Sequence, residues 1–236
     1  MCGRFTIIRL SEFLDRFPWI VRTDAAPMPA RYNVAPSQAV AAVTNQQSKI
    51  DYVRWGLVPS WAKDLSVGNR MINARAETLA EKPAFSRLLR RRRCLIPADG
   101  FYEWRKNPDG KTKTPMYIRM TGGRPFAFAG LWDTWHDPDG ATVPSCTIIT
   151  TTPNELMRPI HDRMPVILKE ADYQRWLAPE ETPAESLTKL LEPYPAGEME
   201  AFAVSKAVNS PRVDAPQLIE PVREETSAGT LWGDER

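Results

Sequence analysis

The sequence contains few of the residues that build metal centres and disulfide frameworks. It has 3 cysteines and 2 histidines in 236 residues. Cys2, Cys94 and Cys146 lie far apart and lack the short spacings typical of zinc sites, so no metal is expected. Sparse, unpaired cysteines fit a reducing compartment better than a disulfide-stapled secreted domain. We therefore expect a cytoplasmic protein without a metal or other cofactor.

Long apolar runs and a strong charge imbalance are also missing. No run of about 18 apolar residues occurs, so no membrane span is predicted. Arg4, Arg9 and Glu12 interrupt the apolar stretch that a signal peptide needs at the start of the chain. The net charge is +2, so any nucleic-acid binding must depend on local charge clusters. The dense basic run, Arg87 with 90–93, fits a solvated helix face as well as a binding surface.

What is present is an ordinary globular composition, with 42% hydrophobic and 25% charged residues. This length provides ample core for one large domain. Strand-like segments joined by Gly, Pro and Asp turns predict an antiparallel meander, bent into a barrel or a strongly curved sheet. The predicted strands are 39–43, 50–53, 94–96, 100–104, 116–120, 126–132 and 146–150.

A few helices are predicted to flank this sheet. Apolar residues at helical spacing over 10–17 predict an early amphipathic helix, and Pro83 is typical of the first turn of a second one. The sequence 152–155 has the form of a capping box and predicts a short helix before His161. Further helices are predicted near 170–177 and 184–191.

The domain organisation is predicted to be simple. No internal repeat or linker is evident, which indicates a single α+β domain over residues 1–222. Periodicity fades from about Ser210, and 223–236 is predicted to be a loose tail.

The first three residues, Met1-Cys2-Gly3, carry the most specific chemistry. Methionine before a small residue is normally trimmed, which would leave Cys2 with a free α-amine beside its thiol. The amine condenses with an aldehyde to an imine, and the thiol then closes a thiazolidine ring. An α-amine titrates near ~7.7–8.0 and a cysteine thiol near ~8.5, so modest tuning makes both reactive at neutral pH. Taken alone, these residues fit a disordered chain start equally well.

Four other segments are unusual for a plain core. The aromatic loop 55–61 fits stacking on unpaired bases, worth roughly 1–3 kcal/mol each, or core aromatics beside a turn. The segment 72–78 holds an amide, a cation and a carboxylate. Glu103 stands among apolar neighbours, where a carboxylate pKa tends to rise, unless it points to solvent. His161 fits a catalytic or a structural role.

Together, six motifs in the same order closely resemble the SOS-response-associated peptidase (SRAP) family, also described as abasic-site processing proteins. The resemblance runs from residue 1 to about 222 and implies one SRAP-type domain. The motifs are 1–5, 31–36, 55–61, 72–78, 94–104 and 160–165.

The resemblance implies a function. Family members recognise abasic sites in single-stranded DNA and trap them as a covalent DNA–protein crosslink. It therefore implies a monomer whose partner is single-stranded DNA with abasic sites, in the cytoplasm and at the nucleoid when bound. It also implies self-removal of Met1, thiazolidine formation by Cys2, and reversal of the crosslink. Since no base is present at the lesion, recognition should depend little on sequence.

The resemblance also assigns roles to single residues. Cys2 would supply the amine and thiol, and Asn73 would position Cys2 and the sugar. Glu103 would move protons to and from the amine and the imine, while His161 would help to open the sugar ring. The implied DNA contacts are Arg4, Asn33, Trp61, Arg75, Trp104, Thr150 and Arg163. Contacts to phosphates place a strand without reading its sequence.

Two positions depart from the family pattern, and two other function classes stay open. Some members carry a second tryptophan where this chain has Ala62, and an arginine where it has Pro83 beside Lys82. These differences concern the preference for DNA junctions and not the chemistry. An N-terminal-nucleophile amidohydrolase, such as a glutamine amidotransferase, can also begin Met-Cys-Gly. A non-catalytic reader of modified or single-stranded nucleic acid is the second alternative.

Overall fold

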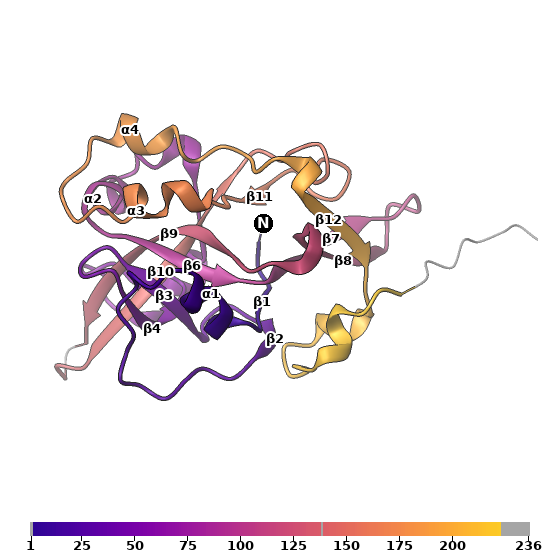
Figure 1. Cartoon of the computed structure of the whole chain (residues 1–236), viewed down its shortest axis with the longest axis horizontal. Helices are drawn as coiled ribbons and strands as arrows, with labels where there is room; N and C mark the ends of the chain where they lie inside the picture. Colours follow the sequence, from indigo (N-terminus) through magenta and orange to yellow (C-terminus); the bar gives the residue numbers. More distant parts are fainter. Residues whose placement is uncertain (1, 138, 223–236) are drawn as a thin grey trace, which may run out of the picture.

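Two β-sheets form the centre of the computed structural model, which describes residues 2–137 and 139–222 (Figure 1). In the larger sheet, β11-β10-β4-β3-β6-β9 lie in this order, and β9 also pairs with β10. Five strands, β10, β4, β3, β6 and β9, therefore close into a ring, which confirms the barrel-like α+β fold. The bounds are β3 Ala39–Thr44, β4 Lys49–Trp55, β6 Arg93–Ala98, β9 Phe126–His136, β10 Thr142–Thr151 and β11 Met164–Pro165.

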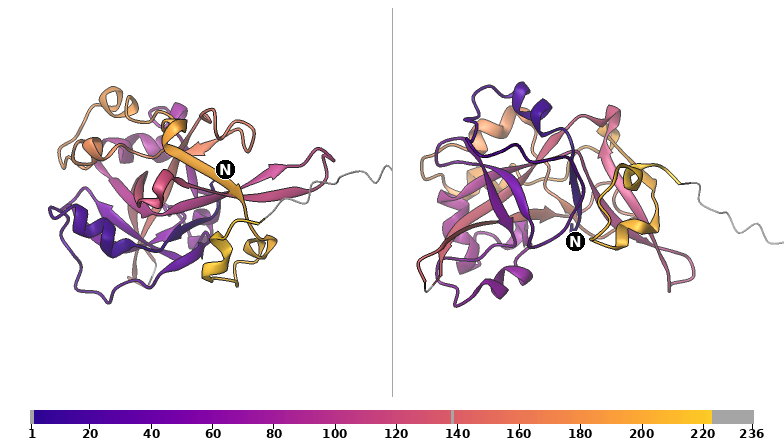
Figure 2. Two further views of the ribbon diagram at one scale, coloured as in Figure 1. Left: turned by 45° about the vertical axis from the view of Figure 1, so that its right-hand side comes forward. Right: turned by 90° about the horizontal axis from the view of Figure 1, so that it is seen from below.

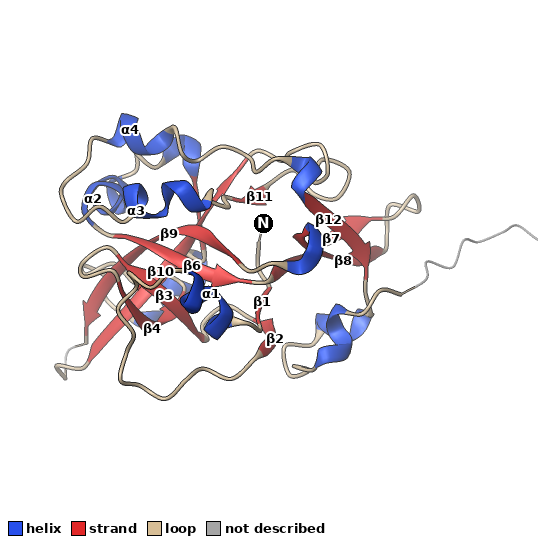
Figure 3. Ribbon diagram, in the orientation of Figure 1, coloured by secondary structure: helices blue, strands red, loops and turns tan. Residues whose placement is uncertain are grey.

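The smaller sheet lies beside this barrel, with strand order β12-β8-β7-β1-β2 (Figure 3). All of its pairings are antiparallel. A further short strand, β5, pairs in parallel with the end of β10. The bounds are β1 Phe5–Ile7, β2 Arg31–Val34, β5 Asn73–Arg75, β7 Gly100–Lys106, β8 Lys113–Met120 and β12 Met199–Ala203.

The core fills the barrel and the space between the two sheets. All six residues of β6 and nine of the eleven in β9 are buried, which explains why both segments read as continuous apolar runs. Phe5 packs edge-on against Trp55 of the barrel, with ring centroids 5.1 Å apart. At Gly130, a Cβ would lie 2.8 Å from the Cys94 Sγ, so no larger residue fits where β6, β9 and β10 meet.

Short helices surround the sheets, and α2, α3 and α4 gather at one end of the barrel (Figure 1). The buried Arg93 guanidinium ties this group together, because it donates to the carbonyls of Leu89 at the end of α2 and Trp176 at the end of α3. The α-helices are α1 Leu10–Arg16, α2 Pro83–Arg91, α3 Tyr173–Trp176 and α4 Ala184–Thr188. The 3-10 helices are η1 Leu65–Arg70, η2 Ala76–Thr78, η3 Thr121–Gly123, η4 Glu170–Asp172, η5 Ala196–Glu198, η6 Lys206–Asn209 and η7 Pro216–Ile219.

The predicted helix between the capping-box sequence and His161 is wrong. Residues 155–160 form hydrogen-bonded turns, and Asn154 Oδ1 accepts from the Met157 N–H at 2.9 Å. Pro159 explains the failure, because it lacks an N–H donor and disfavours the helical conformation at the residue before it.

The segment after Ser210 is better ordered than its sequence indicates. It includes η7, Leu218 is 2% exposed, and Val204 pairs with Pro221 in a β-bridge. The tail predicted at 223–236 lies outside the described residues, so that boundary stays a prediction. No helix within the described ranges combines the length and apolar character that a bilayer span requires.

Candidate active site

The start of β1 carries Cys2 into the interior, between the two sheets. Strand β1, drawn in indigo, runs through the middle of the molecule in both views of Figure 2. Cys2 is fully buried, and its carbonyl accepts a hydrogen bond of 2.7 Å from Nδ2 of Asn73. Asn73 is fixed in turn, because it opens β5 and pairs with Ile148 of β10. Oδ1 of Asn73 is buried without a hydrogen-bond partner among the described residues, so it is available to a ligand.

Glu103 lies in the adjacent strand and is almost completely buried. The pairing of Phe5 with Phe101 sets β1 against β7 and brings Cys2 beside this carboxyl group. Glu103 is 2% exposed, and burial raises its pKa. Burial, followed by repulsion from Glu103, also raises the pKa of the Cys2 thiol. At neutral pH the thiol therefore keeps its proton and lies near a carboxyl group poised to exchange one.

His161 contributes a third titratable group from the loop after β10. Its Nε2 lies 3.9 Å from the Glu103 Oε2. Its Nδ1 accepts from the Arg163 backbone N–H at 3.1 Å, so a neutral ring carries its proton on Nε2, the nitrogen facing Glu103. Asp162 Oδ1 lies 2.9 Å from the same Nδ1. The two ring nitrogens therefore face different partners, Nε2 toward Glu103 and Nδ1 toward Asp162 and the Arg163 backbone.

Arg163 is held at the edge of the site by Glu77. The guanidinium makes two bonds to the Glu77 carboxylate, at 2.7 and 3.0 Å, and this contact lowers the pKa of Glu77. Nη2 of Arg163 also donates to the Thr150 carbonyl at 2.6 Å. Arg75 pairs in register with Thr150 and exposes its side chain beside this pair. Two cations therefore flank the site at the end of β10.

Arg4, Asn33 and Trp104 lie together on the other side, against the segment 205–214. Arg4 Nη1 donates to Asn33 Oδ1 at 2.6 Å, and its guanidinium lies 6.0 Å from the Trp104 ring centroid. The Asn33 amide donates to the carbonyls of Val208, Ser210 and Val213. Trp104 is half-buried and donates to Asn209.

Two of the expected DNA contacts have no exposed side chain. Asn33 and Thr150 are both 0% exposed, so in this arrangement they support Arg4 and Arg163 and offer no surface to DNA. Trp61 is 67% exposed, but it lies in the loop between β4 and η1 and faces α2.

Sequence reasoning missed three supporting elements. Glu77 lies within the 72–78 motif and Asp162 is adjacent to His161, but the sequence does not show which residue each of them contacts. The segment 205–214 gave no signal, because it meets Asn33 through backbone carbonyls, which every sequence has. No cluster of three or more His, Cys, Asp or Glu side chains able to hold a metal occurs within the described ranges.

A sequence profile of the SOS response associated peptidase (SRAP) family matches residues 1–211. The chain belongs to this family. A match of this extent includes every element that forms the site, from β1 to the loop carrying His161 and Arg163.

Relatives of the SRAP family come from bacteria and eukaryotes. The chain is 49% identical to "Abasic site processing protein YoqW" of Bacillus subtilis, over 93% of this chain and 99% of that protein. It is 33% identical to "Abasic site processing protein HMCES" of Xenopus tropicalis, over 71% of this chain and 56% of that protein. The chain thus spans about half the length of this eukaryotic relative and nearly all of the bacterial one.

Solved structures share the fold. A crystal structure of a protein from Bacteroides thetaiotaomicron matches with a TM-score of 0.84 at 27% identity, covering 94% of this chain and all of that one. A protein from Bordetella bronchiseptica matches with a TM-score of 0.73 at 26% identity, covering 86% of this chain and all of that one. These matches support the single-domain SRAP architecture.

Proposed function

We propose that this protein recognises abasic sites in single-stranded DNA and traps them as a thiazolidine crosslink through Cys2, once Met1 has been removed. The observation that carries the proposal is the convergence of Cys2, Asn73, Glu103 and His161 from four separate segments. The names of the relatives, which refer to abasic-site processing, support the same substrate.

The first step is opening of the abasic sugar, which exists mainly as a closed hemiacetal. Opening moves the proton of the C1′ hydroxyl to the ring oxygen and leaves an aldehyde at C1′. His161 suits this transfer, because its Nε2 faces the buried Glu103 at 3.9 Å while its Nδ1 lies 2.9 Å from Asp162, so the ring lies between two proton-exchanging groups. The unpartnered Oδ1 of Asn73 can accept from the hydroxyl that opening creates.

The second step joins the aldehyde to Cys2. The α-amine attacks C1′, and the carbinolamine loses water to give an imine. The thiol then adds across the C=N bond, and its proton ends on the nitrogen, so aldehyde and aminothiol give thiazolidine plus water. Because its pKa is raised by burial, Glu103 can take the proton from the amine and return it to the leaving hydroxyl. The same proton transfers in reverse dissolve the crosslink.

Self-removal of Met1 belongs to the same proposal, with Cys2 and Glu103 serving both reactions. The thiol would attack the carbonyl that precedes it, and Glu103 would carry its proton to the departing amine. Cleavage by water then regenerates the thiol and leaves the free α-amine that crosslinking needs.

The DNA path follows the cations on either side of Cys2. We assign phosphate contacts to Arg4, Arg75 and Arg163, and stacking contacts to Trp61 and Trp104. Each neutralised phosphate of a single strand adds roughly 0.7 to the slope of log affinity against log salt. The protein is proposed to act as a monomer, which light scattering in the presence and absence of DNA would test.

Mass spectrometry of the protein mixed with an abasic single-stranded oligonucleotide tests the proposal. We expect a denaturation-resistant adduct, one water lighter than the sum of its parts, on a protein that has lost Met1. Cys2→Ala should abolish it, whereas Cys2→Ser should give only an imine that borohydride traps. A full adduct yield from Cys2→Ala would refute the assignment. Release of ammonia from glutamine would indicate an amidohydrolase, and reversible binding alone would indicate a non-catalytic reader.

A further inference from the structure

Helix α2 presents a row of arginines that the proposed reaction does not use. Phe85, Leu88 and Leu89 of this helix are buried against the barrel, whereas Arg87, Arg90 and Arg91 are exposed. The helix therefore turns one apolar face inward and one strongly basic face outward.

The arginines of this run differ in how their charge is balanced. Arg91 forms an ion pair with Glu181 at 2.6 Å, Arg92 lies 4.4 Å from the Trp132 ring centroid, and Arg93 is buried. Arg87 and Arg90 have no acidic partner within the part of the chain that the structure describes. These two guanidinium groups are free to meet an anion from solution.

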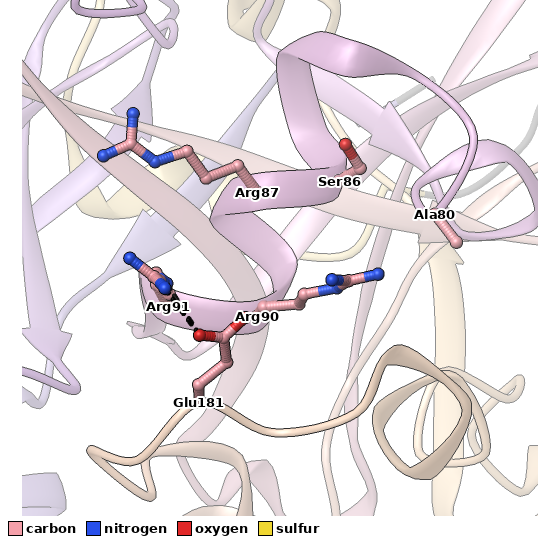
Figure 4. A pocket seen from close by; sticks show the side chains of 6 residues that line it. All are labelled: Ala80, Ser86, Arg87, Arg90, Arg91 and Glu181. Atoms are coloured by element: carbon pink, nitrogen blue, oxygen red, sulfur yellow. Dashed lines mark hydrogen bonds and ion pairs between the residues drawn. The ribbon is translucent and has the colours of Figure 1, made fainter.

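The surface around α2 is hollowed on two sides. On one side, Ala80, Ser86, Arg87, Arg90, Arg91 and Glu181 line a cavity of about 420 Å³, and the Arg87 and Arg90 side chains spread in opposite directions from the helix (Figure 4). On the other side, a groove of about 390 Å³ runs between Trp61 and the helix, with Arg87 and Arg91 on its wall. An exposed aromatic ring beside arginines is the usual combination for binding unpaired nucleotides.

This surface continues from the edge of the site. Arg75 ends β5, Glu77 lies in η2, and the next turn brings the chain to Ala80, which lines the cavity. Ala80 lies five positions after Arg75, so at most about 18 Å of chain joins them. A DNA strand that leaves the site past Arg75 and Arg163 therefore reaches α2 within a few nucleotides.

We propose that α2 extends the DNA-binding surface beyond the active site. This inference rests on the proposed function. The single strand continues from the abasic site onto α2. Its phosphates then contact Arg87 and Arg90, and an unpaired base stacks on Trp61. The ligand is the strand that carries the lesion, and it is held without sequence preference.

The test compares short and long single strands, each with one abasic site chemically reduced to block crosslinking. The short strand has about 4 nucleotides and the long one about 16, the range that single-strand sites occupy. Arg87→Ala combined with Arg90→Ala should weaken binding of the long strand and lower its salt slope by about 1.4, at roughly 0.7 per phosphate. Binding of the short strand should stay unchanged. Alanine is a good helix former, so α2 should persist, which circular dichroism would verify.

Lys111→Ala combined with Lys113→Ala provides a matched control. It removes the same charge from the hairpin of β7 and β8, at the opposite end of the molecule from α2 (Figure 1). The control should leave the salt slope for the long strand intact. Trp61→Ala should weaken binding of the long strand through lost stacking.

Equal losses on short and long strands, or no loss on either, would overturn the inference. A loss seen only when the far end of the strand is made duplex would also overturn it and assign α2 to duplex DNA. Crosslinking of the unreduced short strand is measured in parallel. If the wild type forms no crosslink, the proposed function fails, while the length-dependent binding still decides the role of α2.

Discussion

Asn33→Ala is the substitution that most sharply separates a structural role from a DNA contact. The wild-type amide meets three backbone carbonyls at 2.6 to 3.3 Å, and its Oδ1 accepts from Arg4 at 2.6 Å. The side chain is fully buried, so truncation leaves these polar groups inside the protein without their partner.

The expected cost follows from these bonds. An amide group has two N–H donors, so the three carbonyl contacts count as two bonds of about 1 kcal/mol each. The bond to the Arg4 guanidinium is charge-assisted and is worth about 1.5–3 kcal/mol. Asn33→Ala should therefore lower the free energy of unfolding by about 3.5–5 kcal/mol.

Urea unfolding followed by tryptophan fluorescence measures this loss, and Asn209→Ala is the control. Asn209 is exposed and offers one bond, from Trp104 at 2.7 Å, so its removal should cost about 1 kcal/mol or less. At low urea, where Asn33→Ala is still folded, the slope of log affinity for single-stranded DNA against log salt should drop by roughly 0.7. The reason is that Arg4 has lost the hydrogen bond that orients its guanidinium group. Normal stability combined with weakened DNA binding would contradict the reasoning and make Asn33 a direct contact.

Three further predictions concern the site. Glu103→Gln should slow crosslinking and its reversal by about 10²–10⁴-fold, measured on denaturing gels, and should remove the rise in rate that accompanies deprotonation of Glu103. Burial raises the pKa of Glu103, so ionising this group in the folded protein costs stability once the pH exceeds its unfolded-state pKa of about 4.3. Glu103→Gln should therefore melt at a higher temperature than the wild type at neutral pH, and a lower melting temperature would contradict this. His161→Ala should slow crosslinking to the closed abasic sugar far more than to a simple aldehyde, and equal losses on both would exclude a role in ring opening. Glu77→Gln should free Arg163 for phosphate and tighten single-strand binding about two- to fivefold by fluorescence anisotropy, whereas weaker binding would show that the ion pair aims the arginine.

The fold was predictable where a local pattern determines an element. The apolar spacing at 10–17 marks α1, and the turns between apolar runs mark the barrel strands. Strand ends were less predictable, because tertiary pairing sets them. The run 126–132 extends to His136 in β9, since β10 supplies partners as far as Thr142.

The site was predictable only through the resemblance of its motifs to a family. Read alone, Cys2, Glu103 and His161 each fit a structural role equally well, because a single sequence does not show which distant residues meet. Asn73 reaches Cys2 across 71 positions. The support from 205–214 was beyond prediction, since its contacts with Asn33 use backbone carbonyls that no residue type signals.

The closed ring of five strands bears on how the protein folds. Its strands come from residues 39–151, and Arg4 meets the carbonyl of Val208 across 204 positions. Long-range pairings of this kind give a high contact order, and such chains refold slowly, over milliseconds to seconds. Cys2 and Asn73 become neighbours only when β5 joins β10, so a partly folded chain holds an unshielded thiol and no assembled site. After dilution from denaturant, recovery of crosslinking should therefore trail hydrophobic collapse and coincide with the last cooperative phase of refolding.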